Sequence, residues 1–238
     1  TPLGRILMNI INSIVKLKNR IIYNKLSKFA HPQKFKWQWD EKLFNRIALI
    51  NFLVSKTGGW ECAYLEIGCN KDTLFNSVAV QSKIGVDPLI GGTHRMTSDE
   101  FFKENKKMFD VIFIDGLHEY TQVRKDALNA LNVLNEGGWI IFHDFLPGDW
   151  KMQHVPRMQS TWNGDVWKAA IELNNAVGLN LQIIKIDQGM GVLRKLSKDF
   201  EVPDMYEDLI NSKFSRFVTE LPNLPTFEFE EFIENILE

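Results

Sequence analysis

FDVIFIDG, at residues 109–116, is the clearest strand in the sequence, a largely apolar run that ends in an aspartate and a glycine. A short apolar run bounded by turn residues is typical of a strand that is buried on both faces. Similar runs occupy residues 62–67, 84–87 and 139–142, and helical patterns at residues 72–81 and 118–134 separate them. This alternation of strands and helices predicts an α/β fold with a Rossmann-like, doubly wound sheet.

A hairpin is expected to close this sheet. Residues 181–186 and 190–193 are separated only by Asp187-Gln188-Gly189, which favours an antiparallel pair at the C-terminal edge. With a short strand at residues 93–96, the sheet has about seven strands. Ser98 is expected to cap the helix that follows. We expect three parts: a helical, basic N-terminal extension at residues 1–45, the sheet domain at residues 46–198, and an acidic C-terminal extension at residues 199–238.

Composition narrows the class of protein. Hydrophobic residues make up 45% and charged residues 24%, as in an ordinary globular protein. No apolar run is long enough to span a membrane, and no signal-peptide pattern opens the sequence. Cys62 and Cys69 do not provide a disulfide framework, which favours a reducing, cytoplasmic location.

Charge is distributed unevenly. Residues 1–36 hold eight Lys or Arg and no acid, whereas residues 199–238 hold eleven acids against two basic residues. The basic start leaves two interpretations open: peripheral contact with an anionic membrane, or two chain ends that pack together or are solvated. The middle is nearly neutral and has no dense basic stripe, which argues against nucleic acid as a partner.

Polar or glycine residues follow each expected parallel strand. Since ligands of open α/β sheets bind outside the carboxyl ends of the strands, these residues together predict a ligand site. Gly68 stands without the further glycines of a G-x-G-x-x-G loop, so a dinucleotide is poorly supported. The strand-end residues are Glu66, Gly68 and Asn70, then Asp87 and Pro88, then Asp115, Gly116 and His118, and finally His143 and Asp144.

The ordered motifs YLEIG (64–68), GVDP (85–88), FDVIFIDG (109–116) and GGWII (137–141) resemble those of class I S-adenosylmethionine-dependent methyltransferases. IDGLHEY (114–120), Asp126 and the pair His143-Asp144 resemble the small-molecule O-methyltransferase branch related to macrocin-type enzymes. The resemblance covers residues 49–195 and implies S-adenosylmethionine as cofactor. The cofactor-binding residues that it implies are Glu66, Gly68, Asn70, Asp87, Pro88, Ser98, Asp115 and Gly116.

An oxygen acceptor must lose a proton, which requires a base or a metal ion that lowers its pKa. His118 and His143 are the candidate catalytic bases. Asp115, His143 and Asp144 end two adjacent strands and could instead bind a divalent metal ion, as acidic or amide residues do in the metal-dependent enzymes that this chain resembles. Imidazole suits manganese, iron or zinc better than magnesium. Both alternatives stay open: a transition-metal site, or a metal-free site with a histidine base.

The segment at residues 162–168 holds the candidate substrate-binding residues, which are Trp162, Asp165, Trp167 and Lys168. Tryptophans can stack on a sugar or another flat acceptor, and the charged residues can fix polar groups. In the alternative interpretation the tryptophans anchor the core and Asp165 is an acid at the start of a helix.

The expected function is that of a cytoplasmic S-adenosylmethionine-dependent O-methyltransferase acting on a small polar molecule such as a sugar. One alternative is a nicotinamide-dependent oxidoreductase on a related sheet. The other is a non-catalytic, methyltransferase-like binding module at a membrane surface. A homo-oligomer is compatible with the sequence.

Overall fold

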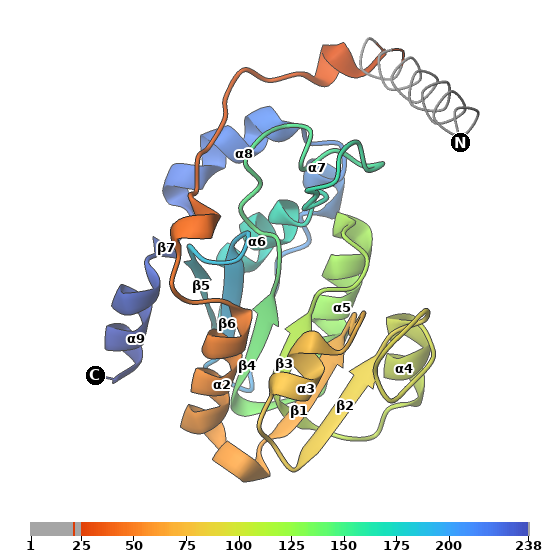
Figure 1. Ribbon diagram of the computed structural model, residues 1–238, viewed down its shortest axis with the longest axis vertical. Helices are drawn as coiled ribbons and strands as arrows, with labels where there is room; N and C mark the ends of the chain where they lie inside the picture. The colour runs from red at the N-terminus through yellow and green to blue at the C-terminus, as the bar shows by residue number, and fades with distance from the viewer. Residues whose placement is uncertain (1–20, 22–24, 238) are drawn as a thin grey trace, which may run out of the picture.

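The computed structural model describes residues 21 and 25–237 and contains a seven-stranded sheet in the order β2-β1-β3-β4-β6-β5-β7 (Figure 1). The first four strands are parallel, β6 is antiparallel to both β4 and β5, and β7 is parallel to β5. The predicted Rossmann-like sheet and its antiparallel hairpin are therefore confirmed. The strands are β1 (Ala63–Ile67), β2 (Ser82–Val86), β3 (Phe109–Ile114), β4 (Leu134–Phe142), β5 (Leu179–Ile184), β6 (Met190–Lys195) and β7 (Thr226–Phe227).

Helices cover both faces of the sheet. Successive residues of a strand point to opposite sides, so an apolar strand presents side chains on both faces that the helices bury. Ile112 and Ile140 belong to a core shared with α4 (Ser98–Glu104), α5 (Tyr120–Asn132), α6 (Trp167–Asn174) and α8 (Phe214–Glu220). Val111 and Ile141 belong to a second core with α2 (Arg46–Thr57), α3 (Thr73–Ser77) and α9 (Phe229–Leu237). The remaining helices are α7 (Tyr206–Leu209) and the 3-10 turns η1 (Ser27–Phe29), η2 (Trp39–Glu41), η3 (Gly59–Glu61) and η4 (Leu221–Asn223).

Three expectations about local structure are wrong. Residues 93–96 form no strand, and only a single bridge joins His94 to Val86. The cap of α4 is Thr97, whose side chain accepts from the backbone N–H of Glu100 while the Glu100 carboxylate accepts from that of Thr97. The strand β4 begins at Leu134, earlier than expected, because the chain pairs with β3 across a register shift before the regular ladder starts.

The acidic C-terminal part packs against the sheet on both faces. Phe217 of α8 and Phe232 of α9 are fully buried, one in each core. β7 adds a short strand beside β5, so the seventh strand comes from this part of the chain.

Most of the basic start, and with it the expected N-terminal helix, lies outside the described residues. Across residues 21 and 25–237, no helix combines the length and the apolar character needed to cross a membrane. Membrane contact through the basic start therefore stays a prediction, as do the cytoplasmic location and the oligomeric state.

Candidate active site

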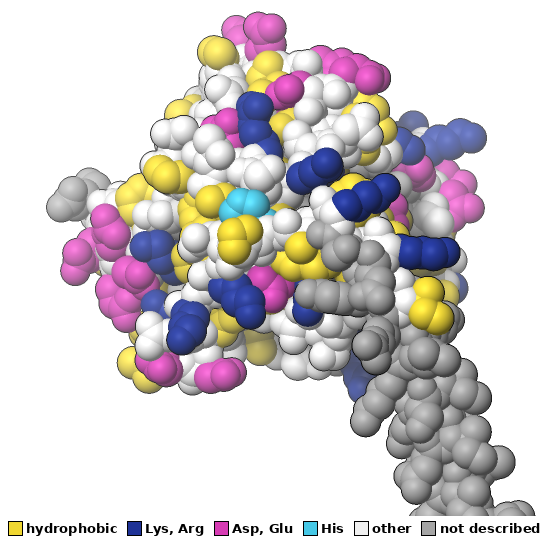
Figure 2. Space-filling model, turned by 90° about the horizontal axis from the view of Figure 1, so that it is seen from above, with side chains coloured by type: hydrophobic (Ala, Val, Ile, Leu, Met, Phe, Trp, Pro, Cys, Tyr) yellow, Lys and Arg dark blue, Asp and Glu magenta, His cyan; other side chains and the backbone are white. Residues whose placement is uncertain are grey.

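A cavity of about 320 Å³ opens at the carboxyl ends of β1 and β3. Four of the predicted cofactor residues line it, namely Glu66, Gly68, Asn70 and Asp115, together with Arg46 and Asp187, which the sequence did not single out. Figure 2 views the molecule from above, the side toward which the parallel strands run in Figure 1, and shows hydrophobic and basic side chains around a histidine on this face.

Gly68 brings the ends of β1 and β3 into direct contact. Its φ is +88°, and a Cβ there would lie 2.1 Å from the carbonyl oxygen of Asp115, so no other residue fits. The loop that follows turns without a second glycine. Asn70 (φ 47°) and Asp72 (φ 61°) adopt the left-handed conformation, which Asn and Asp tolerate better than other side chains do.

Asp87 joins two loops at the end of β2. Its carboxylate accepts hydrogen bonds from the backbone N–H groups of Asn70 (2.9 Å), Leu89 (2.8 Å) and Ile90 (3.0 Å). Burial opposes ionisation, but these three bonds and the charge of Arg95 hold the pKa of Asp87 below its ordinary value. The carboxylate therefore organises the loop at residues 69–72, which borders the cavity.

The other predicted cofactor residues lie outside the lining of this cavity. Pro88 follows Asp87 in the turn. Ser98 stands at the start of α4, where its hydroxyl accepts a hydrogen bond from Gln122. Gly116 follows β3 and also lines no part of the cavity. The structure thus gathers half of the predicted cofactor set around one opening.

Asp87→Ala is expected to weaken binding of S-adenosylmethionine by roughly 10-fold or more, since bonds to charged groups contribute ~1.5–3 kcal/mol. The physical reason is the loss of the three hydrogen bonds that the carboxylate accepts from the loop backbone, and of a charge that the resemblance assigns to cofactor binding. Calorimetry with S-adenosylmethionine measures the affinity, and thermal unfolding shows whether the variant is folded. Asp204→Ala, at a side chain that is 80% exposed, is the control. Unchanged affinity in a folded variant would remove Asp87 from the site.

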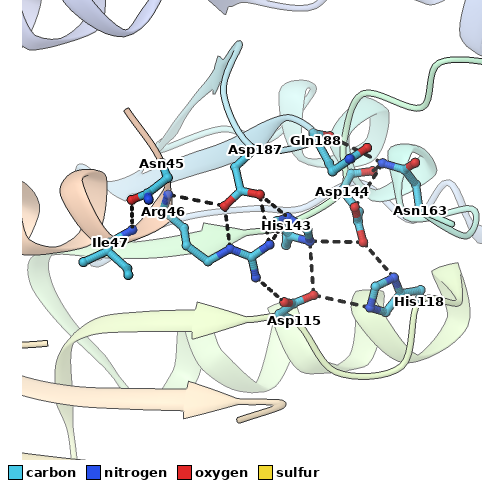
Figure 3. A network of polar contacts seen from close by, with 10 residues as sticks. All are labelled: Asn45, Arg46, Ile47, Asp115, His118, His143, Asp144, Asn163, Asp187 and Gln188. Atoms are coloured by element: carbon cyan, nitrogen blue, oxygen red, sulfur yellow. Dashed lines mark hydrogen bonds and ion pairs between the residues drawn. The ribbon is translucent and has the colours of Figure 1, made fainter. Parts of the chain in front are cut away.

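Two aspartates and two histidines converge beside the cavity, and we call Asp115, His118, His143 and Asp144 the strand-end cluster (Figure 3). The Nε2 atom of His118 lies 3.3 Å from Asp115 Oδ1, and its Nδ1 atom lies 2.7 Å from Asp144 Oδ2. The Nδ1 atom of His143 lies 3.2 Å from Asp115 Oδ1 and 3.1 Å from Asp144 Oδ2. The predicted trio of Asp115, His143 and Asp144 therefore lies together, and His118 joins it.

Arg46 and Asp187 complete the charge balance of this cluster. Arg46, the first residue of α2, donates to Asp115 Oδ2 and to Asp187 Oδ2, each at 2.6 Å. Asp187 lies in the β5–β6 turn, 3.4 Å from the Nε2 atom of His143. The four residues of the strand-end cluster, with Arg46 and Asp187, are six ionisable groups of both signs. Their opposite charges compensate one another, which allows them to lie close together in a partly buried site.

The cluster shifts the pKa of its members strongly. Burial opposes the charge of each group, but the neighbouring opposite charges prevail. The pKa of Asp115 lies well below its ordinary value beside His143, His118 and Arg46, and that of Asp144 is also lowered. Asp115 and Asp144 raise the pKa of His118 to about 9 and that of His143 well above its usual range. At neutral pH both imidazoles are therefore protonated, and each must lose that proton before it can act as a base or bind a metal ion.

The orientation of the cluster suits a cation. The Nδ1 atoms of both histidines and the Oδ2 atom of Asp144 are buried, yet their close approaches lack the angles of hydrogen bonds. One ligand atom each from Asp115, His118 and Asp144 lies within 4.8 Å of the others. Imidazole nitrogens with carboxylate oxygens are a donor set for manganese, iron, cobalt or zinc. The residues present therefore fit a divalent transition-metal ion.

The four candidate substrate residues separate in the structure. The Trp162 ring stacks on His118, while Trp167 is fully buried and donates to Gln153 within the core. Asp165 accepts from the backbone N–H of Tyr120 and pairs with the buried Lys168 at 2.8 Å. Asp165 and Lys168 line a second cavity of about 360 Å³ beside α5 and α6, which the two tryptophans do not line.

A methyltransferase-domain family matches residues 77–145, the segment that runs from the end of α3 through β2, β3 and β4 to the strand-end cluster. The matched segment is a methyltransferase domain. The methyl donor of class I methyltransferases, whose motifs this chain resembles, is S-adenosylmethionine. No curated protein matches the methyltransferase significantly.

Solved structures share the fold of this methyltransferase. TomG from Streptomyces achromogenes, an O-methyltransferase involved in tomaymycin synthesis and solved with SAM, superposes with a TM-score of 0.50 at 12% identity, over 64% of this chain and 80% of that chain. Cofactor-bound Rv0187 from MTB superposes with a TM-score of 0.50 at 12% identity, over 66% and 84% of the two chains. The nicotinamide-dependent and non-catalytic alternatives gain no support from these comparisons.

Proposed function

We propose that this methyltransferase transfers the methyl group of S-adenosylmethionine to an oxygen of a small polar acceptor such as a sugar, with a divalent transition-metal ion in the strand-end cluster. One observation carries the proposal: two imidazole nitrogens and a carboxylate oxygen, all buried and without hydrogen-bond partners, converge beside the cavity. Asp115 belongs both to this cluster and to the lining of the cavity. The O-methyltransferase activity named for TomG agrees with this assignment.

The cavity offers the charges that the cofactor needs. S-adenosylmethionine carries a sulfonium and an ammonium group, and Glu66 and Asp115 present carboxylates to the same opening. Methyl transfer is a direct displacement at the sulfonium carbon, so the protein's task is to align the acceptor oxygen, the methyl carbon and the sulfur. Gly68 lines this opening, and its missing side chain lets the end of β1 lie directly against the backbone of Asp115 at the end of β3.

Asp115, His118, His143 and Asp144 would hold the metal ion. Once bound, the ion would supply Lewis acidity and lower the pKa of the acceptor hydroxyl. Arg46 and Asp187 flank the cluster and keep Asp115 and His143 in position through their ion pairs. A sugar suits such a site because neighbouring hydroxyls offer two oxygens to one ion.

Chelation tests the proposal. Methyl transfer to a panel of hydroxylated acceptors, followed as the demethylated cofactor product, is expected to disappear after exhaustive EDTA treatment. Manganese, cobalt or zinc should restore it better than magnesium, because imidazole ligands favour those ions. Elemental analysis of the purified protein gives an independent measurement of the bound metal.

Full activity after exhaustive chelation, together with no metal in elemental analysis, would contradict the metal site. In that case the metal-free alternative would hold, with His118 or His143 as the base. His118 is the more accessible of the two, since its side chain is 26% exposed against 8% for His143.

A further inference from the structure

The turn at residues 162–164 contacts the strand-end cluster from outside the sheet. It belongs to the irregular segment between β4 and α6, and its three residues are Trp162, Asn163 and Gly164. Trp162 contacts the His118 ring, Asn163 contacts Asp144, and Gly164 lies against the His118 backbone. The turn thus provides a second support for the side chains of His118 and Asp144, in addition to the strands that precede them.

Trp162 fixes the plane of the His118 ring. The two rings are stacked, with centroids 5.3 Å apart and planes inclined by only 8°. The indole is itself held, because its Nε1 atom donates a hydrogen bond to the carbonyl oxygen of His154 at 2.7 Å. A flat ring anchored in this way restricts rotation of the imidazole about its side-chain bonds.

Asn163 fixes the carboxylate of Asp144. The asparagine is fully buried, and its Nδ2 atom donates to Asp144 Oδ1 at 3.0 Å (Figure 3). The bond leaves Oδ2 facing the Nδ1 atoms of the two histidines. Asp144 also has a φ of 70°, a costly conformation for aspartate that persists only where surrounding contacts impose it.

Gly164 allows the turn to approach this closely. A Cβ at Gly164 would overlap the carbonyl oxygen of His118, and its φ of +65° also favours glycine. The backbone N–H groups of Asn163 and Gly164 both donate to the carbonyl oxygen of Met152, at 2.9 and 3.1 Å. The turn is therefore held on one side by residue 152 and pressed on the other against His118.

We propose that Trp162 and Asn163 are positioning residues, which set the imidazole of His118 and the carboxylate of Asp144 for binding the metal ion. This inference rests on the proposed function. It also assigns Trp162 a role different from the predicted stacking on the acceptor, because the indole ring stacks on His118 and the Arg157 guanidinium lies over it, 5.8 Å from the ring centroid. Supporting contacts of this kind typically change metal affinity by roughly 10–100-fold when they are removed.

Titration of the full-length protein with cobalt(II), followed by visible absorption, tests the proposal. Asn163→Ala and Trp162→Leu should bind cobalt roughly 10–100-fold more weakly and shift its absorption bands. Trp162→Phe retains a flat ring and should bind nearly as well as the wild type. The matched controls Asn132→Ala and Trp60→Leu lie at exposed positions away from the cluster and should change neither quantity. Unchanged affinity and unchanged bands in both test variants would overturn the proposal.

A second measurement separates this inference from the metal site itself. If the wild type binds no cobalt, the metal site of the proposed function is refuted. NMR of the His118 ring protons in the metal-free protein then tests whether Trp162 positions His118. The stacked indole should shield these protons, so their resonances should move downfield in Trp162→Leu and stay in place in Trp60→Leu. His118 resonances that do not respond to loss of Trp162 would overturn the positioning role.

Discussion

Asp115→Asn is expected to lower kcat/KM by roughly 10–100-fold, the loss that corresponds to removing a hydrogen bond to a charged group, while the fold persists. The amide has the same shape but takes a negative charge away from Arg46, His118 and His143, all of which lie within 3.3 Å of its oxygens. It also replaces a carboxylate ligand of the proposed metal ion and a charge that lines the cavity proposed for the cofactor. Metal affinity should therefore fall together with turnover.

Steady-state kinetics and cobalt titration of the Asp115→Asn variant measure these effects. Circular dichroism establishes that the variant is folded. Asp208→Asn is the matched control, since it makes the same change at a side chain of α7 that is 57% exposed. If Asp115→Asn keeps the wild-type kcat/KM, the residue takes no part in the chemistry and the site lies elsewhere on the sheet.

Glu66→Gln is expected to stabilise the ligand-free protein at pH 8 and to weaken cofactor binding. Glu66 is almost fully buried, and burial, assisted by the charges of Asp115 and Asp72, raises its pKa to about 7 despite a hydrogen bond from the Tyr64 hydroxyl. Because the folded pKa lies above the ordinary value, stability is greatest below about pH 4.5 and is lost as the pH rises to about 7. The cost of ionising Glu66 in the folded state is of order 3 kcal/mol, and glutamine removes it.

Cofactor binding should respond to pH in the opposite direction. The positive charges of S-adenosylmethionine favour the ionised carboxylate, so wild-type affinity should fall as the pH drops through about 7. Loss of that charge in Glu66→Gln should weaken binding by roughly 10–100-fold at pH 8 and remove the pH dependence. Thermal unfolding and calorimetry at pH 6 and pH 8 measure both effects.

Glu61→Gln, at an exposed residue before the other end of β1, is the control for Glu66→Gln. A melting temperature at pH 8 that is equal to or below that of the wild type would show that Glu66 carries no burial cost. Equal affinity for S-adenosylmethionine would remove it from the cofactor pocket.

The sequence allowed the parallel strands and the hairpin to be predicted because each is an apolar run closed by glycine or a polar residue. The segment at residues 93–96 has no such run, and the structure shows only one bridge there. β7 escaped prediction since two residues after Pro225 give no periodicity, and its pairing with Ile183 and Ile184 is a tertiary contact. Thr97 and Ser98 are both good caps, and only the position of Glu100 three residues after Thr97 distinguishes them.

Asp115, His118, His143 and Asp144 could be located from the sequence, because they follow parallel strands whose carboxyl ends lie at one edge of the sheet and bind ligands there. Arg46 was missed since one arginine in an amphipathic helix resembles a solvated surface residue, and nothing local links it to Asp115. Asp187 was recognised only as a turn residue. Its proximity could have been inferred from topology, because β6 runs antiparallel to β4 and pairs Gly191 with Phe142, just before His143.

The pairing of β7 with β5 has a consequence for biosynthesis. The outer side of β5 at Ile183 and Ile184 stays without its partner strand until residues 226 and 227 have left the ribosome, although β5 itself ends at Ile184. An open strand edge invites pairing with other chains, and domains form progressively as the chain emerges. The nascent protein is therefore expected to pass through an interval in which most of its sheet can assemble while one border is exposed to pairing with other chains.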